Sequence, residues 1–457
     1  MHQVSPVPLS VMIRNISRSI GLKLVLVSGL ALLMSIPAFF VSDVVDERAK
    51  RASDVRGEIS GRTGGQQTFL GPSLTIPFTF PLAPKEHSSG VYVVFPTKGD
   101  ATVKIHTEER RRSLFKVPVY QADLKFDASF DLTNVPSALP SGAELDWSRA
   151  AIVVGASDVR GALVDGALMV DGKKMTFVPA GNVGEDNPRL PLAYFGVRAT
   201  DWAKANATFD VTANLRFSGA QRIAFLAYGK STHIAVDGDW PSPGFDGGFL
   251  PVKRAISPQG FSSEWSVPFI ARGVPAEGTN TVVSGLDRTG MGISLIEVAD
   301  PYQSVNRSVK YALLFVALLF LSYFVFEATS GKRVHPAQYI LVGVAHLIFY
   351  LLLLSLAERF GFDCGFLVAA VATVLLLSAN AKWIFASRTQ GLRALFVFSL
   401  LYFFIYMLLR LEDNALLVGA VASFLAVTAV MYFTRNLDWY SAVIGSSKST
   451  LSSESDS

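Results

Sequence analysis

The segment HPAQYILVGVAHLIFYLLLLSLAERFGF (residues 335–362) contains an apolar run long enough to cross a bilayer as a single helix. Gln338 and His346 lie inside this run, and Glu358 lies at its end. A polar side chain in hydrocarbon is costly and needs a partner. These residues are therefore either parts of a functional site or polar links between neighbouring helices.

The composition of the whole chain indicates a membrane protein with a large water-exposed part. Of its 457 residues, 50% are hydrophobic and 17% are charged, which is more apolar than an ordinary soluble protein. Between apolar regions near residues 20–41 and 308–433, the composition is that of a soluble domain. The single cysteine, Cys364, lies in an apolar run, so no intramolecular disulfide is expected.

Six apolar segments of about 20 residues predict six transmembrane helices. We expect them at residues 20–41, 309–329, 336–357, 362–380, 392–411 and 415–433. The first follows a basic, acid-free N-terminus, which would also suit a signal peptide or a transit peptide. Its length, and the absence of a small-x-small cleavage site, favour an uncleaved anchor. A short charged helix is predicted to follow it.

The charges of the links between these segments predict their orientation. Residues 330–336 and 381–393 are basic, whereas residues 358–363 and 410–414 each hold one arginine and two acids. The positive-inside rule then places both termini in the cytoplasm. Residues 1–19 and a disordered tail, 434–457, are expected there, and residues 42–307 are expected in the periplasm of a bacterium.

The exported segment 42–307 is predicted to be β-rich. Residues 122–132 and 205–217 alternate strictly between apolar and polar, which is typical of half-buried strands. The Asp-Gly pairs at 171–172 and 237–238 predict hairpin turns. The sequence therefore predicts one N-terminal transmembrane helix, a β-sandwich-like periplasmic domain and a five-helix transmembrane bundle.

A weak internal match leaves open whether the domain has two lobes. KFDASFDL, from residue 125, and TFDVTANL, from residue 208, match at Phe126 and Phe209 and at two further positions with the same offset. The match indicates two related β lobes, or else the chance likeness of two amphipathic strands.

Several motifs in order resemble those of the CreD family of bacterial inner-membrane proteins. They are Gly64-Gly65-Gln66-Gln67, GPSLTIPF at 71–78, the aromatic series at 239–273, the membrane segments from residue 305 to 362, and LDWY at 437–440. In 61–78, the Gly-Gly and Gly-Pro pairs predict a loop that leads into a strand. The resemblance covers roughly residues 20–440. It implies an envelope-integrity protein linked to envelope stress and the β-lactam response, and it implies no biochemical activity. Where the family tends to have Ser-Glu-His, this chain has Ala357-Glu358-Arg359, so no role of that histidine carries over.

The third predicted span carries most of the candidate residues. Tyr339, Gly343, His346 and Tyr350 recur at helical spacing and share one face. His346 would serve a proton relay or a ligand contact, or it is a neutral imidazole hydrogen-bonded across helices, which we favour. Gly343 would let a neighbouring helix approach closely.

The remaining candidates lie at the ends of the spans. Glu327 is expected to contact Lys332 or Arg333. His335 and Gln338, at the same end, would satisfy the end of a helix or interact with these cations. Glu358 lies at the opposite end, where it would join Asp363, Glu412 and Asp413 in an acidic rim, or lie in a solvated loop.

Two stretches of the exported segment also admit two interpretations. The arginine cluster at 109–113 would meet anionic lipid or an acidic polymer, or it protects the edge of a strand. The aromatic stretch WPSPGFDGGFLP (residues 240–251) is either a binding loop or a rigid cover over the core.

Three classes of function remain in competition. The first is a non-enzymatic envelope protein that acts through its periplasmic domain on other envelope proteins or cell-wall components. The second is a transporter or flippase-like protein with His346 and Glu327 in a polar relay. The third is a membrane-embedded hydrolase, for which the sequence offers no nucleophile–base pair and no metal-ligand spacing. We favour the first, with the lipid bilayer as a partner, without cofactor, metal or nucleic acid, and with the oligomeric state open.

Overall fold

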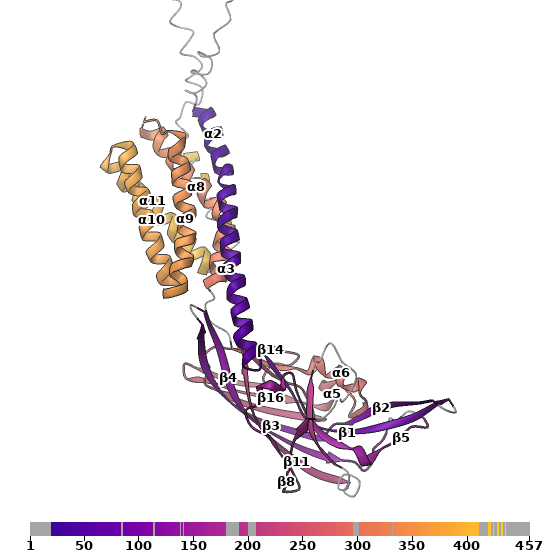
Figure 1. Ribbon diagram of the computed structural model, residues 1–457. Helices are drawn as coiled ribbons and strands as arrows, with labels where there is room; N and C mark the ends of the chain where they lie inside the picture. The colour runs from indigo at the N-terminus through magenta and orange to yellow at the C-terminus, as the bar shows by residue number, and fades with distance from the viewer. Residues whose placement is uncertain are drawn as a thin grey trace, which may run out of the picture. The chain divides into compact units, whose positions relative to one another are not determined.

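The computed structural model describes residues 20–410, apart from 84–85, 113–114, 138, 140, 180–191, 200–206, 296–300 and 331, and isolated residues between 419 and 435. The chain divides into two compact units. The helical unit comprises Met1–Arg51 and Ala299–Ser457, and the β domain comprises Ala52–Val298. Figure 1 shows the helices of the first and the strands of the second.

Long apolar helices and a short, more polar one form the described part of the helical unit. They are α2 (Ile20–Leu33), the first part of α3 (Ser35–Arg62), α7 (Pro301–Lys310), α8 (Ala312–Ser330), α9 (Pro336–Phe360), α10 (Phe362–Phe385) and α11 (Arg388–Arg410). Among the described residues, five helical segments are long and apolar enough to cross a membrane, with Lys23–Arg62 taken as one of them. They correspond to the first five predicted spans. The sixth, at 415–433, and the tail at 434–457 fall largely outside the described residues.

The charged helix predicted after the first span continues it without a loop. Helix α3 begins at Ser35 in an apolar stretch and ends at Arg62, so its residues belong first to the helical unit and then to the β domain.

The turn between α9 and α10 is a single glycine. Helix α9 ends before Gly361, which has a φ of +82° and donates its N–H to the Ala357 carbonyl. Glycine tolerates this positive φ, and α10 begins at the next residue.

Two sheets form the β domain. The larger has the strand order β14-β18-β12-β1-β6-β10-β9, with β2, β5 and β17 joined at its side. Its strands are β1 (Gln67–Ala83), β2 (Glu86–Val94), β5 (Glu144–Leu145), β6 (Ala151–Ala156), β9 (Val178–Pro179), β10 (Ala193–Arg198), β12 (Arg222–Phe225), β14 (Pro243–Gly247), β17 (Glu277–Thr279) and β18 (Met291–Leu295). Strands β1 and β12 are parallel.

The smaller sheet has the order β15-β16-β13-β3-β4-β11-β7-β8. Its strands are β3 (Lys98–Arg112), β4 (Phe115–Asp131), β7 (Ala167–Val170), β8 (Lys173–Thr176), β11 (Thr208–Ala220), β13 (Ser231–Gly238), β15 (Lys253–Ser257) and β16 (Gly260–Val267). Short helices α5 (Phe269–Arg272), α6 (Thr281–Ser284) and the 3-10 turn η3 (Gly285–Thr289) connect strands. Residues of both sheets share one buried core, so the β-rich, sandwich-like prediction is confirmed.

The two strictly alternating segments are neighbours in one sheet. Strands β4 and β11 pair antiparallel, with Phe130 opposite Phe209 and their ring centroids 5.0 Å apart. Their alternating apolar side chains all face the shared core, which explains why their sequences look alike. The interpretation of two related lobes is therefore wrong for these strands.

Only one of the two predicted Asp-Gly hairpin turns is present. Asp171 and Gly172 have φ values of 45° and 81°, and they close the hairpin of β7 and β8. The prediction for Asp237-Gly238 is wrong, because both residues belong to β13. They pair with β16 on one side and with β3 on the other, and these two ladders keep the backbone extended.

The Gly71-Pro72 pair also lies inside a strand rather than in a loop. Strand β1 runs through it, and its register against β6 shifts between Leu70 and Ser73. A Cβ atom at Gly71 would lie 2.6 Å from the Tyr228 ring, and one at Gly99, on the other sheet, would lie 2.7 Å from the same ring. Glycine is needed at both positions because a buried tyrosine fills the space between the sheets.

Candidate functional site

An ion pair joins the first helix of the helical unit to the α8–α9 hairpin. The Lys23 ammonium of α2 donates to Glu327 Oε1 at the end of α8. Lys23 Nζ also donates to the Val334 carbonyl at 3.0 Å, and the Val334 N–H donates to Glu327 Oε1 at 2.9 Å. Tyr339 Oη donates to Glu327 Oε2 at 2.9 Å. The carboxylate is therefore held by donors from three segments.

This arrangement corrects the expected partner of Glu327. Lys332 instead donates to the Phe385 carbonyl at the end of α10, at 2.6 Å. The basic N-terminus seen in the sequence includes Lys23, but no local pattern there indicates its partner. The signal that would have found the pair is a single lysine near the start of one span and a single glutamate near the end of another, since a buried charge in hydrocarbon needs an opposite one.

His346 forms a second polar cluster, in the interior of the bundle. Its side chain is fully buried. Nδ1 lies 2.8 Å from Tyr402 Oη of α11, and Nε2 lies 3.2 Å from Tyr350 Oη, one turn further along α9. A neutral imidazole has one donor and one acceptor nitrogen, so one tyrosine donates to it and the other accepts from it. Tyr402 was not singled out in the sequence.

The shared face predicted for α9 is present. Tyr339, Gly343, His346 and Tyr350 are all buried. A Cβ atom at Gly343 would lie 2.8 Å from the Met34 sulfur and 2.9 Å from Phe320, so glycine allows close helix packing at this position, as predicted.

His335 begins α9 and Gln338 lies in its first turn. His335 Nδ1 accepts the Ala337 N–H at 3.2 Å, so the imidazole caps the helix, as one of the two interpretations predicted. Among the described residues, the Gln338 side chain takes part in no hydrogen bond; its backbone N–H donates to the His335 carbonyl.

Glu358 lies at the opposite end of α9, where an acidic rim was one expectation. It accepts a hydrogen bond from Tyr302 Oη of α7 at 2.9 Å. Asp363 forms an ion pair with Arg410 and accepts a hydrogen bond from Tyr406 Oη at 3.0 Å. The other two acids of the expected rim, Glu412 and Asp413, lie outside the described residues.

The clusters on α9 are separate sites. Tyr339 and His346 are seven positions apart, which is about 10 Å along a helix, and Glu358 lies about 18 Å beyond His346. Neither separation is bridged by a single hydrogen bond. Within the part of the chain that the structure describes, no group of three or more His, Cys, Asp or Glu residues is placed to hold a metal.

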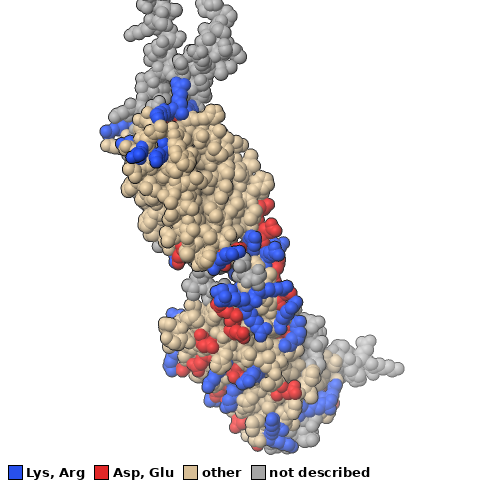
Figure 2. All heavy atoms as spheres, turned by 60° about the vertical axis from the view of Figure 1, so that its left-hand side comes forward, with Lys and Arg blue, Asp and Glu red and all other residues tan. Residues whose placement is uncertain are grey.

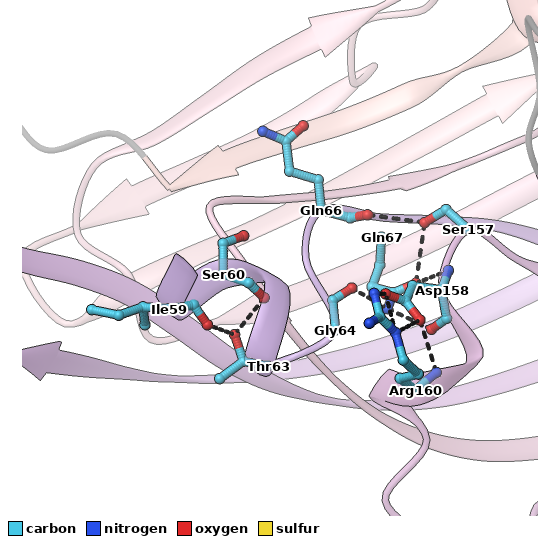
Figure 3. A network of polar contacts seen from close by, with 9 residues as sticks. All are labelled: Ile59, Ser60, Thr63, Gly64, Gln66, Gln67, Ser157, Asp158 and Arg160. Atoms are coloured by element: carbon cyan, nitrogen blue, oxygen red, sulfur yellow. Dashed lines mark hydrogen bonds and ion pairs between the residues drawn. The ribbon is translucent and has the colours of Figure 1, made fainter. Parts of the chain in front are cut away.

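A further polar network, in the β domain, fixes the end of α3 (Figure 3). Gly64 leaves the helix with a φ of +89°, and the buried Gln67 amide donates to the Gly64 carbonyl at 2.7 Å and the Asp158 carbonyl at 2.9 Å. Ser157 Oγ donates to the Gln66 carbonyl at 2.9 Å and contacts Gln67 Oε1 at 3.2 Å. The Gly-Gly-Gln-Gln motif is thus a joint between a helix and a sheet.

Charged residues are distributed differently in the helical unit and in the β domain. Figure 2 shows a broad uncharged band on the helical unit, with Lys and Arg at one end and charges of both signs at the other. The basic links 330–336 and 381–393 contact each other, since Lys332 donates to the Phe385 carbonyl. In the β domain, Arg111 lies 3.4 Å from Glu109, and Arg112 forms an ion pair with Glu58 of α3. Two arginines of the 109–113 cluster are thus neutralised locally.

A comparison of the sequence with protein families agrees with this architecture. The family described as "Inner membrane protein CreD" matches residues 19–440. The chain belongs to the CreD family. It is 29% identical to the inner membrane protein CreD of Escherichia coli (strain K12) over 422 residues, which are 90% of this chain and 92% of that relative. This member of the family is therefore a multi-pass inner-membrane protein with a large β-rich domain.

Proposed function

We propose that this protein is a non-enzymatic contributor to envelope integrity and to the response to envelope stress and β-lactams. In this proposal the β domain lies in the periplasm and interacts with envelope proteins or cell-wall components, while the helical unit is its platform. The observation that carries the proposal is the pairing of buried polar groups across helices: Glu327 with Lys23 and Tyr339, and His346 with two tyrosines. Groups used in this way hold helices together.

The proposed orientation, with both termini in the cytoplasm, rests on charge. The basic links 330–336 and 381–393 contact each other through Lys332 and the Phe385 carbonyl, and the positive-inside rule assigns such basic links to the cytoplasm. A cysteine introduced at the exposed Asp165 of the β domain should react with a membrane-impermeant maleimide in intact spheroplasts, if the native Cys364 is first replaced by alanine. Labelling only after lysis would reject the orientation.

A relay in a transporter is the second candidate, because one specific observation favours it. Tyr350, His346 and Tyr402 form a continuous hydrogen-bonded series inside the bundle. Such a series of titratable groups is a feature of proton paths in membranes.

One substitution separates the two candidates. His346→Gln keeps a donor and an acceptor at the position but removes the basic nitrogen. A strain that lacks the native gene would be complemented with this variant or with the unaltered protein, at matched abundance, and scored for β-lactam tolerance. We expect full complementation. Loss of tolerance at unchanged abundance would reject the platform role and favour the relay.

Partners of the β domain can be sought with the full chain. A photo-crosslinking residue at the exposed Ile270 or Leu250 of the β domain should capture the same envelope component in stressed cells from either position. A matched residue at the lipid-exposed Phe396 of α11 serves as control. Identical crosslinks from all three positions would indicate non-specific capture and contradict a role for the β domain.

A further inference from the structure

A cavity opens in the β domain, apart from the polar clusters described above. Its volume is about 440 Å³, which is within the usual range for small-molecule sites. Three segments form it: the loop after β14, the end of α5 with the turn that follows, and the α6–η3 turn. The lining residues that matter here are Phe249, Arg272, Val274, Ser284, Asp287 and Arg288.

The loop after β14 belongs to the aromatic stretch 240–251 of the sequence. The N–H groups of Gly248 and Phe249 donate to the Gly290 carbonyl at 2.7 and 3.2 Å, and the Phe249 carbonyl accepts Trp265 Nε1–H at 3.0 Å. The wall that Phe249 provides is thus fixed to β16 and to the residue before β18. The cavity is a built part of the fold rather than a gap beside a loose loop.

Arg272 is a buried cation in the wall of this cavity. Its exposed fraction is 3%. Nε donates to the Ala227 carbonyl at 2.9 Å, Nη1 contacts the carbonyls of Val274 and Pro275 at 3.3 and 3.1 Å, and the guanidinium carbon lies 4.2 Å from the centre of the Phe95 ring. Within the described residues, Nη2 has no hydrogen-bond acceptor, and the partners of this arginine are carbonyls, with no carboxylate among them.

These contacts leave the charge of Arg272 only partly compensated. Carbonyl dipoles and an aromatic ring stabilise a guanidinium, but a buried cation normally has an anion beside it. Burial lowers the pKa of Arg272 to about 10, so the group remains protonated at neutral pH. Nη2 itself is sealed from solvent, so Arg272 contributes positive charge from behind the wall of the cavity rather than a free N–H.

The rest of the lining contains both polar and apolar residues. Arg288 and Ser284 are exposed at the cavity, and Asp287 is its one acid against two guanidinium groups. Phe249 and Val274 supply apolar surface. A ligand that matches this lining carries a negative charge at one end and a short apolar body at the other.

We propose that this cavity binds a small organic anion, whose acidic group lies against the exposed Arg288 and is attracted by the buried charge of Arg272, and whose apolar body lies against Phe249 and Val274. The inference goes beyond the proposed function and does not depend on it. It gives the β domain a ligand-binding site of its own.

The test uses the full chain in phosphatidylcholine nanodiscs, with 4-phenylbutyrate as the anionic probe and 4-phenylbutyramide as its neutral counterpart. Isothermal titration calorimetry, corrected with protein-free nanodiscs, should give a dissociation constant on the order of 1 mM for the anion, as expected for so small a ligand. The amide should bind at least roughly tenfold more weakly, because it carries no charge to pair with Arg288 or to be attracted by Arg272. Equal binding of the two probes, or no binding of the anion at 20 times that concentration, about 20 mM, would overturn the proposal.

Two variants locate the site without touching Arg272. Ser284→Trp places a bulky ring at the cavity and should weaken binding of phenylbutyrate roughly tenfold or more. Thr281→Trp adds the same ring at an exposed position of the same short helix that does not line the cavity, and it should bind like the unaltered protein. Unchanged binding by Ser284→Trp, or equal loss in both variants, would place the anion elsewhere and refute the assignment.

Discussion

Glu327 at the end of α8 is paired with Lys23 of α2, a residue 304 positions earlier in the chain. The glutamate side chain is 9% exposed and the lysine side chain 22%, so the pair is largely removed from water. The whole β domain lies between the two residues in sequence. The contact therefore fastens the first helix of the helical unit to the hairpin that follows the β domain.

Loss of one partner should cost more than loss of both. Lys23→Met leaves the Glu327 carboxylate without its counter-ion, and we expect it to lower the free energy of unfolding of the helical unit by about 2 kcal/mol. In Lys23→Met/Glu327→Gln no charge is left unpaired, so the double variant should be more stable than the sum of the single changes predicts. Denaturant unfolding in mixed micelles, analysed as a double-mutant cycle, measures this coupling.

Lys332 provides the matched control for this cycle. It is a neighbour of Glu327 in sequence, but its ammonium contacts the Phe385 carbonyl instead. The effects of Lys332→Met and Glu327→Gln should therefore add. Coupling for Lys332 and none for Lys23 would show that the pairing is wrong.

A methyl group at Gly71 should destabilise the β domain. Its Cβ would lie 2.6 Å from the ring of the fully buried Tyr228, which also contacts the Asp100 and Asp127 carbonyls through its hydroxyl at 2.7 and 3.0 Å. The ring cannot move without breaking these contacts, so Gly71→Ala should cost about 1–3 kcal/mol, as other overpacking changes do. Thermal unfolding followed by tryptophan fluorescence is the measurement.

Gly57→Ala is the comparison for that change. Gly57 lies inside α3, and a Cβ atom there would have no neighbour within 4 Å. Alanine is the better helix former, so this variant should gain about 0.5–1 kcal/mol. A stabilising Gly71→Ala would contradict the packing of Tyr228 between the sheets.

What could be predicted from the sequence follows from short-range physics. The length of an apolar run indicates a span, strict alternation indicates a strand, and both were correct for α9 and for β4 and β11. The His335 cap and the Asp171-Gly172 turn depend on only two to four consecutive residues. Local patterns therefore gave most of the architecture.

The wrong predictions concern residues whose backbone conformation or interaction partner depends on contacts with residues distant in sequence. Gly71-Pro72 was predicted to lie in a loop, but it lies in strand β1, which pairs with β6 on both sides of it. Asp237-Gly238 has the composition of a turn, but two neighbouring strands pair with it. The partners of Glu327 and His346, Lys23 and Tyr402, come from other helices, and no local pattern connects them.

Asp246 should make the β domain sensitive to acid. Arg222 donates to its carboxylate from β12, with Nη2 at 2.6 Å, and Ser294 Oγ of β18 donates at 2.5 Å. These donors, Arg222 above all, hold the pKa of Asp246 below its usual value near 4. A carboxyl group with a lowered pKa in the folded state contributes its full stability above the unfolded pKa, and loses it as the pH falls through the folded pKa.

The Asp246→Asn variant should therefore lose less stability than the unaltered protein between about pH 4 and pH 2. Because the side chain is 40% exposed, the difference should stay below about 1 kcal/mol. Arg222→Met should flatten the same part of the profile, and the double variant should add nothing further. Thermal unfolding at each pH measures these stability profiles. If stability falls with pH in parallel for Asp246→Asn and the unaltered protein, Asp246 does not cause the acid sensitivity.

Gln67 should matter far more than its neighbour Gln66, although the two have the same side chain. The Gln67 amide is fully buried and serves Gly64, Asp158 and Ser157, whereas the Gln66 side chain is exposed. Gln67→Met keeps the length but leaves buried carbonyls without this donor, so it should cost about 2 kcal/mol, and Gln66→Met should cost less than about 0.5 kcal/mol. Thermal unfolding of both variants measures the difference. The rate of hydrogen exchange in the last turn of α3 should rise only in Gln67→Met, because the Gln67 network fixes the end of this helix. Equal exchange rates in the two variants would mean that the network does not fix the helix end.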